Sequence, residues 1–303
     1  MMRSLVASWP VSSENRPAKF RRNGFLSHQS ERCPRPCGRS RAVQSLLILA
    51  LAMVGPARGG EKVYRLHSPR QAGETIVRVF TPDQAGPEGL RTILYVLPVE
   101  AGEDTKWGDP AEEVRQTDLA GRHGLIVTIP TFSDLPWYAD HPSDPQLQQE
   151  SYMLKEVLPL VERLHGVGPT PLERLVVGFS KSGWGAWSLL LRHPDLFSKA
   201  AAWDAPLMQA VPDRFGMEPI FGNQANFERY RVARLARDRA DRLRPESRLI
   251  LTGYFDSFRK HHIEMHDLLT GLGIPHLYRD GPKRAHNWHS GWLAETVALM
   301  VSP

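Results

Sequence analysis

Short apolar runs alternate with longer amphipathic stretches along the chain from residue 61 onward. The short runs are rich in β-branched residues, and several are apolar throughout, which is typical of strands that are covered on both faces of a sheet. This pattern predicts seven strands, at Ile76–Phe80, Ile93–Leu97, Leu125–Ile129, Leu175–Val177, Ala200–Trp203, Leu249–Thr252 and His276–Tyr278.

The longer stretches carry apolar residues at helical spacing; in one of them Leu154, Leu158 and Val161 fall on one face. They predict helices at Ala111–Ala120, Leu147–Leu164, Trp184–Arg192, Phe258–Leu272 and Gly291–Val301. Strands that alternate with helices indicate a mostly parallel sheet with helices on both of its faces. We therefore expect an α/β fold in one domain that spans residues 61–303.

An arginine-rich segment lies within residues 227–248, where eight arginines are interleaved with four acidic residues. A lid or an anion-binding element is one interpretation. A solvated helix laced with i,i+4 ion pairs is favoured, because the two signs of charge are mixed.

The net charge of the whole chain is +5 at pH 7, but the basic residues are unevenly placed. Residues 1–60 hold ten Lys and Arg against Glu14 and Glu31, so the remaining residues carry a net charge of −3. Nucleic-acid binding needs cations clustered on the folded domain. We therefore expect no nucleic-acid partner.

Residues 39–57 have the layout of a secretory signal peptide. Arg39 and Arg41 precede the nine apolar residues Leu46–Val54, and small residues up to Ala57 follow. The apolar run is shorter than the roughly 20 residues that span a bilayer. We expect cleavage near Ala57, a secreted or periplasmic protein, and no membrane span in the mature chain; a buried N-terminal helix is the alternative.

Residues 1–38 are rich in Arg, Ser and Pro and lack hydrophobic periodicity, so we expect a disordered or non-native extension there. Both cysteines, Cys33 and Cys37, lie in this extension. The mature chain would then contain no disulfide and would depend on burial of its core for stability.

The motif with the clearest chemistry follows the predicted strand Leu175–Val177. The sequence there reads Gly178-Phe179-Ser180-Lys181-Ser182-Gly183 and leads into a predicted helix. A serine between small residues at a strand-to-helix turn forms a nucleophile elbow, whose tight turn exposes the hydroxyl above the sheet. The usual G-x-S-x-G pattern has glycine where this chain has Ser182, which is also small. We expect Ser180 to be the nucleophile, with a glycine-rich loop of no chemical role as the alternative.

A serine nucleophile needs a base and an orienting carboxylate, which after such an elbow follow in the order Ser, Asp or Glu, His. Asp256 comes after the sixth predicted strand, and His286 lies in the last loop before the final helix. We predict a triad of Ser180, Asp256 and His286. Asp204, which follows the fifth predicted strand, is the competing carboxylate, and a purely structural role is the alternative for His286.

Three histidines of one predicted helix look like metal ligands, because His262 and His266 are one helical turn apart and His261 adjoins them. With Glu264 they form H-x-E-x-H rather than the H-E-x-x-H of zinc proteases, and no third ligand is apparent. A solvated helix face is favoured, and we predict no metal.

Together these residues resemble the esterase branch of the α/β-hydrolases, the group that includes esterase D, feruloyl esterases and the antigen 85 type acyltransferases. The resemblance covers residues 61–298. It rests on Leu94-Tyr95-Val96-Leu97, on Leu125-Ile126-Val127 followed by Pro136-Trp137-Tyr138, on the elbow, and on His286-Asn287-Trp288, which is similar to the H-x-W around the family's catalytic histidine. It implies the α/β-hydrolase fold and a serine-dependent esterase that uses no cofactor.

The chain departs from this family in the oxyanion loop. Where the family usually has His-Gly after the third strand, this chain has Pro98-Val99-Glu100-Ala101-Gly102. The amide of Lys181 can donate to an oxyanion, and Val99 supplies the expected second amide, since Pro98 has no N–H. Loss of one such donor would cost about 3 kcal/mol of transition-state stabilisation.

We therefore expect an exported serine esterase that hydrolyses carboxylic esters through an acyl-enzyme. Acyl esters of carbohydrates suit an exported enzyme with aromatic residues at its mouth. Trp137, Tyr138, Trp184 and Asp204 are the candidate substrate-binding residues, with core packing of the aromatic rings as the alternative. A binding protein that has lost turnover and a peptidase of the same fold are the competing functions.

Overall fold

The computed structural model describes residues 60–83, 92–165 and 173–302. All of them belong to one compact unit that spans residues 54–303. The expected extension at 1–38 and the expected signal peptide at 39–57, together with both cysteines, lie outside the described residues. Across the described ranges, no helix combines the length and the apolar character that a membrane crossing requires.

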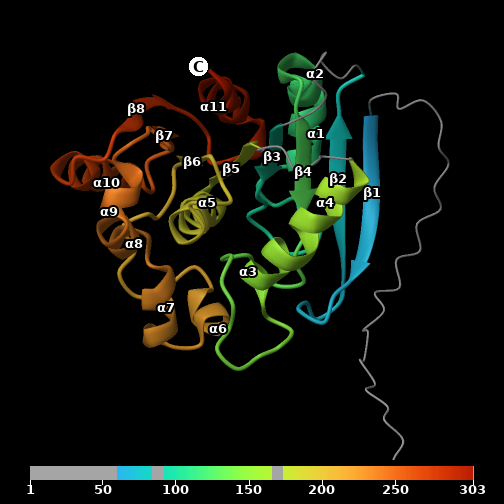
Figure 1. Ribbon diagram of the computed structural model, residues 1–303, viewed down its shortest axis with the longest axis horizontal. Helices are drawn as coiled ribbons and strands as arrows, with labels where there is room; N and C mark the ends of the chain where they lie inside the picture. The colour runs from blue at the N-terminus through green and yellow to red at the C-terminus, as the bar shows by residue number, and fades with distance from the viewer. Residues whose placement is uncertain (1–59, 84–91, 166–172, 303) are drawn as a thin grey trace, which may run out of the picture. The chain divides into compact units, whose positions relative to one another are not determined.

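An eight-stranded sheet forms the centre of this unit (Figure 1), with the strands in the order β1-β2-β4-β3-β5-β6-β7-β8. The strands are β1 Gly60–His67, β2 Glu74–Thr81, β3 Thr92–Val96, β4 Ile126–Pro130, β5 Glu173–Phe179, β6 Lys199–Trp203, β7 Leu249–Tyr254 and β8 His276–Lys283. β2 pairs antiparallel with β1 and β4, and all further neighbours pair parallel. The mostly parallel sheet confirms the predicted fold class. The apolar pattern does not predict β1, because this edge strand leaves most of its side chains exposed.

Helices cover both faces of the sheet, as predicted. They are α1 Pro110–Thr117, α2 Leu119–His123, α3 Gln149–Tyr152, α4 Leu158–Leu164, α5 Ser180–Arg192, α6 Met217–Phe221, α7 Gln224–Tyr230, α8 Val232–Asp238, α9 Ala240–Leu243, α10 Arg259–Gly271 and α11 Trp292–Val301. Ile93 and Tyr95 of β3 join the core under α4, α5, α8 and α10. Leu94 and Val96 alternate with them and join the core under α1, α2 and α11. This alternation explains why the strand sequences are apolar without a polar face.

Two predicted helices are divided in the structure. The one at Ala111–Ala120 becomes α1 and α2, because Asp118 takes a left-handed backbone conformation (φ 47°) and its side chain caps α2 by accepting from the Gly121 amide at 3.2 Å. The one at Leu147–Leu164 consists of α3, the π-helical turn η1 at Met153–Val157, and α4.

The arginine-rich segment forms the short helices α7, α8 and α9. Arg231 pairs with Glu228 at 2.9 Å, and Arg234 pairs with Asp238 at 3.3 Å in the i,i+4 arrangement. These pairs confirm the favoured interpretation of the segment as a helical surface with internal ion pairs.

The loop between β3 and α1 ends at a strong helix start. Asp109 accepts a hydrogen bond from the Ala111 amide at 2.8 Å, and Pro110 occupies the first turn. The fixed start of α1 therefore anchors the far end of the loop that follows β3.

Candidate active site

The elbow consists of the end of β5 and the start of α5, which follow each other without a linker at Phe179 and Ser180. Ser180 has a φ of 52°, a left-handed conformation that non-glycine residues rarely adopt outside functional sites. The turn is so tight that a Cβ at Gly178 would come within 2.5 Å of the Ser182 backbone, and one at Gly183 within 2.9 Å of the Ala205 Cβ. The predicted strand-to-helix turn is thus present.

Ser182, which stands where the elbow pattern usually has glycine, is compatible with this turn. It is fully buried, and its hydroxyl donates to the Phe179 carbonyl at 2.9 Å and accepts from the Phe179 amide at 3.1 Å. Both hydrogen bonds close the turn around Ser180, so the substitution of serine for glycine adds bonds to the elbow instead of opening it.

His286 is held by Asp204. Its Nδ1 lies 2.7 Å from Asp204 Oδ2, and Asp204 is fully buried at the end of β6. The second carboxylate oxygen accepts from the Phe258 amide at 3.2 Å, while the backbone carbonyl of Asp204 accepts from the Ser180 amide at 3.1 Å. The carboxylate is therefore fixed to the histidine through its side chain and to the elbow through its backbone.

Asp256 does not take the position that the sequence assigned to it. Its side chain is 60% exposed and forms an ion pair with Lys283. β7 continues to Tyr254, so Asp256 lies beyond the strand in a solvent-facing turn, whereas Asp204 directly follows its strand. The prediction of Asp256 as the partner of His286 is wrong, and the competing carboxylate Asp204 occupies that place.

Aromatic rings surround the His286 imidazole. The ring centroids of Phe179 and Trp107 lie 4.9 and 5.2 Å from that of His286, both edge to face, and Trp203 lies 6.1 Å away. The Trp288 amide donates to the Trp107 carbonyl at 2.8 Å, which ties the histidine loop to the loop after β3. Packing of this kind limits the imidazole to one orientation, with Nδ1 toward Asp204.

The serine hydroxyl and the outer nitrogen of the imidazole remain available. Within the described ranges, neither Ser180 Oγ nor His286 Nε2 makes a hydrogen bond. The Phe179 ring packs against the imidazole and Ser180 follows Phe179 directly, so the serine hydroxyl and the imidazole belong to segments that are in contact. Hydrogen bonds between such groups are often long before substrate binds.

The loop after β3 is fastened at two points. The Tyr138 hydroxyl donates to the Pro98 carbonyl at 2.6 Å, and the Gly102 amide donates to the Phe132 carbonyl at 2.7 Å. Between these points the Val99 amide has no acceptor among the residues described, and the same holds for the Lys181 amide at the elbow. These are the two N–H groups that the sequence assigned to an oxyanion hole.

Three of the four predicted substrate-binding residues belong to the core. Trp137, Tyr138 and Trp184 are fully buried, and the rings of Trp137 and Trp184 pack edge to face with centroids 5.5 Å apart. Tyr138 packs so closely on α5 that a Cβ at Gly185 would lie 2.0 Å from its ring. Core packing, the alternative interpretation of these rings, is correct, and the fourth residue, Asp204, is the buried partner of His286.

Other aromatic side chains stand at the surface near the histidine. Phe255 is 40% exposed with its ring centroid 6.2 Å from His286. Phe215 is 47% exposed and packs edge to face on Phe258, whose ring is 6.4 Å from His286. The apolar pattern does not single out these rings, although Phe215 and Phe255 lie in loops after β6 and β7, where site residues of parallel sheets gather.

His262 holds the backbone next to Asp204. It is 2% exposed, and its Nε2 accepts a hydrogen bond from the amide of Ala205, the residue after Asp204, at 2.9 Å. Burial lowers the pKa of the His262 imidazole to about 4, against a smaller opposite effect of Asp204. This side chain faces the core, so the expectation of a solvated helix face does not hold for it.

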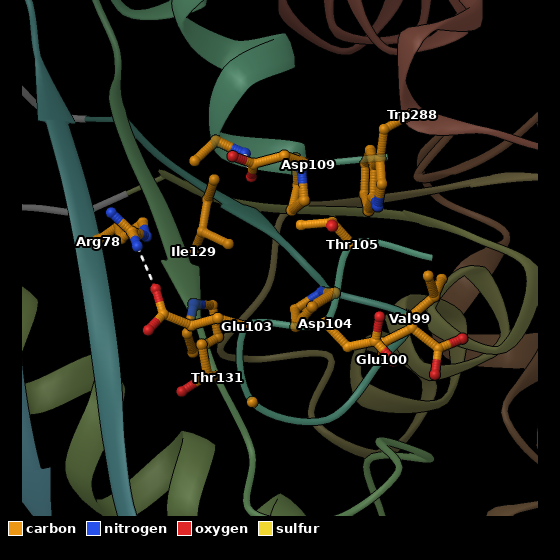
Figure 2. A pocket seen from close by; sticks show the side chains of 15 residues that line it. Arg78, Val99, Glu100, Glu103, Asp104, Thr105, Asp109, Ile129, Thr131 and Trp288 are labelled. Carbon is orange, nitrogen blue, oxygen red and sulfur yellow. Dashed lines mark hydrogen bonds and ion pairs between the residues drawn. The ribbon is translucent and has the colours of Figure 1, made fainter. Parts of the chain in front are cut away.

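A cavity of about 190 Å³ lies behind the oxyanion loop. In Figure 2, Val99 and Glu100 lie on one side of it, and Arg78, paired with Glu103, lies on the opposite side. Trp288 contributes to its wall, whereas Ser180 and His286 do not. The cavity therefore adjoins the candidate site only through Val99 and Trp288.

Comparisons with known proteins agree with this fold. Residues 115–268, half of the chain, match the family described as "Putative esterase". A comparison with curated proteins found no match.

Several solved structures share the fold at low sequence identity. A ferulic acid esterase has a TM-score of 0.60 and 20% identity, over 80% of this chain and 96% of its own. The fluorophosphonate-binding serine hydrolase F of Staphylococcus aureus has a TM-score of 0.62 and 18% identity, over 82% and 100%. An S-formylglutathione hydrolase from Agrobacterium tumefaciens has a TM-score of 0.62 and 18% identity, over 83% and 98%. With a family match over half of its length, the chain belongs to the "Putative esterase" family, and it shares the α/β-hydrolase fold of these solved structures.

Proposed function

We propose that this esterase is a serine esterase in which Ser180 is the nucleophile, His286 the general base and Asp204 the carboxylate that orients the imidazole. The contact of 2.7 Å between Asp204 Oδ2 and His286 Nδ1 carries the proposal. It holds the imidazole proton on Nδ1 and leaves the Nε2 lone pair to accept a proton from a serine. Ser180, whose backbone has a left-handed conformation, carries the hydroxyl whose proton this lone pair accepts.

In the first half of the reaction, Ser180 Oγ bonds to the carbonyl carbon of the ester while its proton passes to His286 Nε2. The carbonyl oxygen becomes an oxyanion that accepts hydrogen bonds from the amides of Lys181 and Val99. When the tetrahedral intermediate collapses, the bond to the alcohol oxygen breaks. The alcohol takes the proton from Nε2 and leaves, and the acyl group stays on Ser180.

In the second half, water attacks the acyl carbon and gives a proton to His286 Nε2. Collapse of the second tetrahedral intermediate breaks the bond to Ser180 Oγ, which regains the proton, and the carboxylic acid leaves. Asp204 stays ionised throughout and stabilises the imidazolium that forms in each half.

The exposed rings of Phe215 and Phe255 indicate which kind of ester could bind. The Phe255 ring lies 6.2 Å from that of His286, and Phe215 packs on Phe258, whose ring lies 6.4 Å from it. Their apolar faces suit an acyl or alcohol group with an apolar face, which both sugar rings and phenolic acids have. Acyl esters of carbohydrates are therefore the substrate class that we propose. A panel of acetylated and feruloylated sugars tests this, and preferential hydrolysis of simple alkyl esters would contradict it.

The test of the reaction uses p-nitrophenyl acetate and a fluorophosphonate probe. We expect the purified protein to hydrolyse the first and to be labelled by the second, and Ser180→Ala to lower kcat by about 1000-fold or more and to abolish labelling. An unchanged thermal unfolding midpoint of the variant controls for folding. A wild-type protein without labelling across neutral and mildly alkaline pH would instead favour a binding protein, and labelling that persists in Ser180→Ala would show that another residue is the nucleophile.

We further propose that the esterase is exported, on the basis of the basic, apolar and small-residue pattern at 39–57. Cleavage after Ala57 would give a mature chain that begins at Arg58. Intact-mass measurement of the protein recovered outside the cytoplasm checks this, and a full-length mass there would refute cleavage.

A further inference from the structure

The oxyanion loop has a gap in its backbone anchoring where the Val99 amide lies. Tyr138 holds the Pro98 carbonyl on one side, and Phe132 holds the Gly102 amide on the other. Between these anchors, the amides of Val99, Glu100 and Ala101 donate to no acceptor among the described residues, and Val99 carries the proposed oxyanion donor. A donor meant for an oxyanion must be left unpaired in this way, so its position has to be fixed by something other than its own hydrogen bond.

Glu100, the neighbour of Val99, provides a contact across the site. Its Oε1 lies 3.2 Å from Nζ of Lys181, the residue that carries the other proposed oxyanion donor. The two side chains are only 13% and 12% exposed. The ion pair therefore connects the loop after β3 with the first turn of α5. Glu100 follows Val99, which carries one of the two amides, and Lys181 carries the other.

We propose, on the basis of the serine esterase function above, that the ion pair of Lys181 and Glu100 is a positioning device that sets the spacing between the Val99 and Lys181 amides. Both side chains are positioning residues, because neither charged group needs to touch the ester.

The energetics favour this role over simple stabilisation. A partly buried ion pair gives up hydration of both groups, so replacing it with apolar residues is often neutral for the stability of a fold. Burial lowers the pKa of the Lys181 ammonium, and Glu100 opposes that effect, as does Asp104, whereas Lys106 adds to it. Glu100 is thus the main group that opposes the lowering of the Lys181 pKa, and what the pair offers is a fixed geometry.

The experiment measures the hydrolysis of p-nitrophenyl acetate by two single variants, Glu100→Gln and Lys181→Met. It also measures hydrolysis by the charge swap, a double variant that combines Glu100→Lys and Lys181→Glu. Full loss of an oxyanion donor lowers kcat by about 100- to 1000-fold, so a displaced donor should lower it less. We expect each single variant to lower kcat by about 10-fold with KM within about twofold of wild type. We expect the swap, which restores the pair in reverse, to return kcat to within about threefold.

Two further readouts separate positioning from a structural or binding role. The inhibition constant of phenylboronic acid, whose serine adduct places an oxygen in the oxyanion hole, should rise in the single variants by the factor by which kcat falls. Hydrogen exchange of the amides at 99–101 should become faster in the same variants, whether or not they turn over substrate.

Glu162→Gln is the matched control. It breaks a similar ion pair, Arg174 with Glu162 at 2.7 Å, whose side chains are 19% and 25% exposed and which lies at the start of β5. We expect kcat, the boronate constant and loop exchange to be unchanged in it.

The outcomes are distinct from those of the proposed function. A wild type that neither hydrolyses esters nor reacts with the fluorophosphonate probe removes the proposed function and this inference together. If wild type is active, three results overturn this inference and leave the serine esterase intact. The single variants keep kcat within about twofold of wild type, the single variants raise KM alone, or the charge swap stays as impaired as the single variants.

Discussion

At the scale of single residues, the chemistry of the site depends on how Asp204 is held. Its two carboxylate oxygens form hydrogen bonds with His286 and with the Phe258 amide. Its backbone has a left-handed conformation (φ 38°) that directs the side chain toward the histidine. Such a conformation is costly for aspartate and persists only where the surroundings fix it. Its backbone bond to Ser180 and the His262 contact with Ala205 are those surroundings.

Asp204→Asn tests the assignment directly. The amide nitrogen of asparagine cannot accept the Nδ1 proton, and the amide oxygen stabilises the imidazolium less than a carboxylate does. We therefore expect kcat for p-nitrophenyl acetate to fall by about 1000-fold or more, as in other triads that lose this carboxylate.

Asp256→Asn is the matched control for that variant, because Asp256 is exposed and pairs only with Lys283. Its kcat should stay within about threefold of wild type, since exposed ion pairs contribute little. A larger loss in Asp256→Asn than in Asp204→Asn would return the carboxylate role to Asp256.

The choice between these two carboxylates also shows what the sequence could give at this scale. Both follow strands near the same sheet edge, and both precede His286 in the expected order. Chain order cannot separate them, but their distances from the strand ends differ. Asp204 adjoins its strand directly, and this short-range signal could have favoured it.

At the scale of elements, α5 and the loop after β3 form one working unit. α5 begins at Ser180, places the Lys181 amide in its first turn and accommodates the Tyr138 ring against Gly185. The same Tyr138 holds the loop through the Pro98 carbonyl. The buried Tyr138 thus fixes the loop that carries the Val99 amide, the proposed oxyanion donor.

The element boundaries that the sequence predicted are close where hydrophobic periodicity and turn chemistry agree. β5 and α5 meet at the elbow because strand residues give way to small residues and then to a helical pattern. The predicted helix at Leu147–Leu164 contains a π-helical turn, which has no signature in the spacing of apolar residues. The edge strand β1 escapes prediction because its exposed side chains carry no apolar pattern.

At the scale of the whole molecule, buried ionisable groups couple its stability to pH. Burial alone would raise the pKa of Glu150, but hydrogen bonds from His193 and Arg192 outweigh it and lower the pKa to about 2. Burial lowers the pKa of His262 to about 4. In both cases the unfolded chain binds more protons than the folded one below its ordinary pKa, so stability falls as the pH falls.

The His262 contribution gives a prediction with a defined window. It is fully present above the ordinary histidine pKa near 6.5 and is lost as the pH falls toward about 4. Between about pH 7.5 and about pH 5 we expect wild type to lose about 2 kcal/mol more of its free energy of unfolding than His262→Gln does. Glutamine keeps an acceptor for the Ala205 amide but does not titrate, and urea unfolding at the two pH values measures the difference.

His67→Gln is the control for that measurement, because His67 is 81% exposed on the edge strand β1. It should follow the pH dependence of wild type. Equal pH dependence in wild type and His262→Gln would show that His262 is not the group that links folding to protons.

The sequence by itself determined the α/β class, the elbow around Ser180 and the loop that carries His286. These depend on hydrophobic period, small residues in a tight turn and chain order, all of which act over short stretches. Only the tertiary structure decided that Asp204 rather than Asp256 meets His286, that Trp137 and Trp184 are core, and that Glu100 reaches Lys181. Those outcomes depend on which faces of distant segments are covered when the sheet is packed, because burial selects which polar groups must find partners inside the fold.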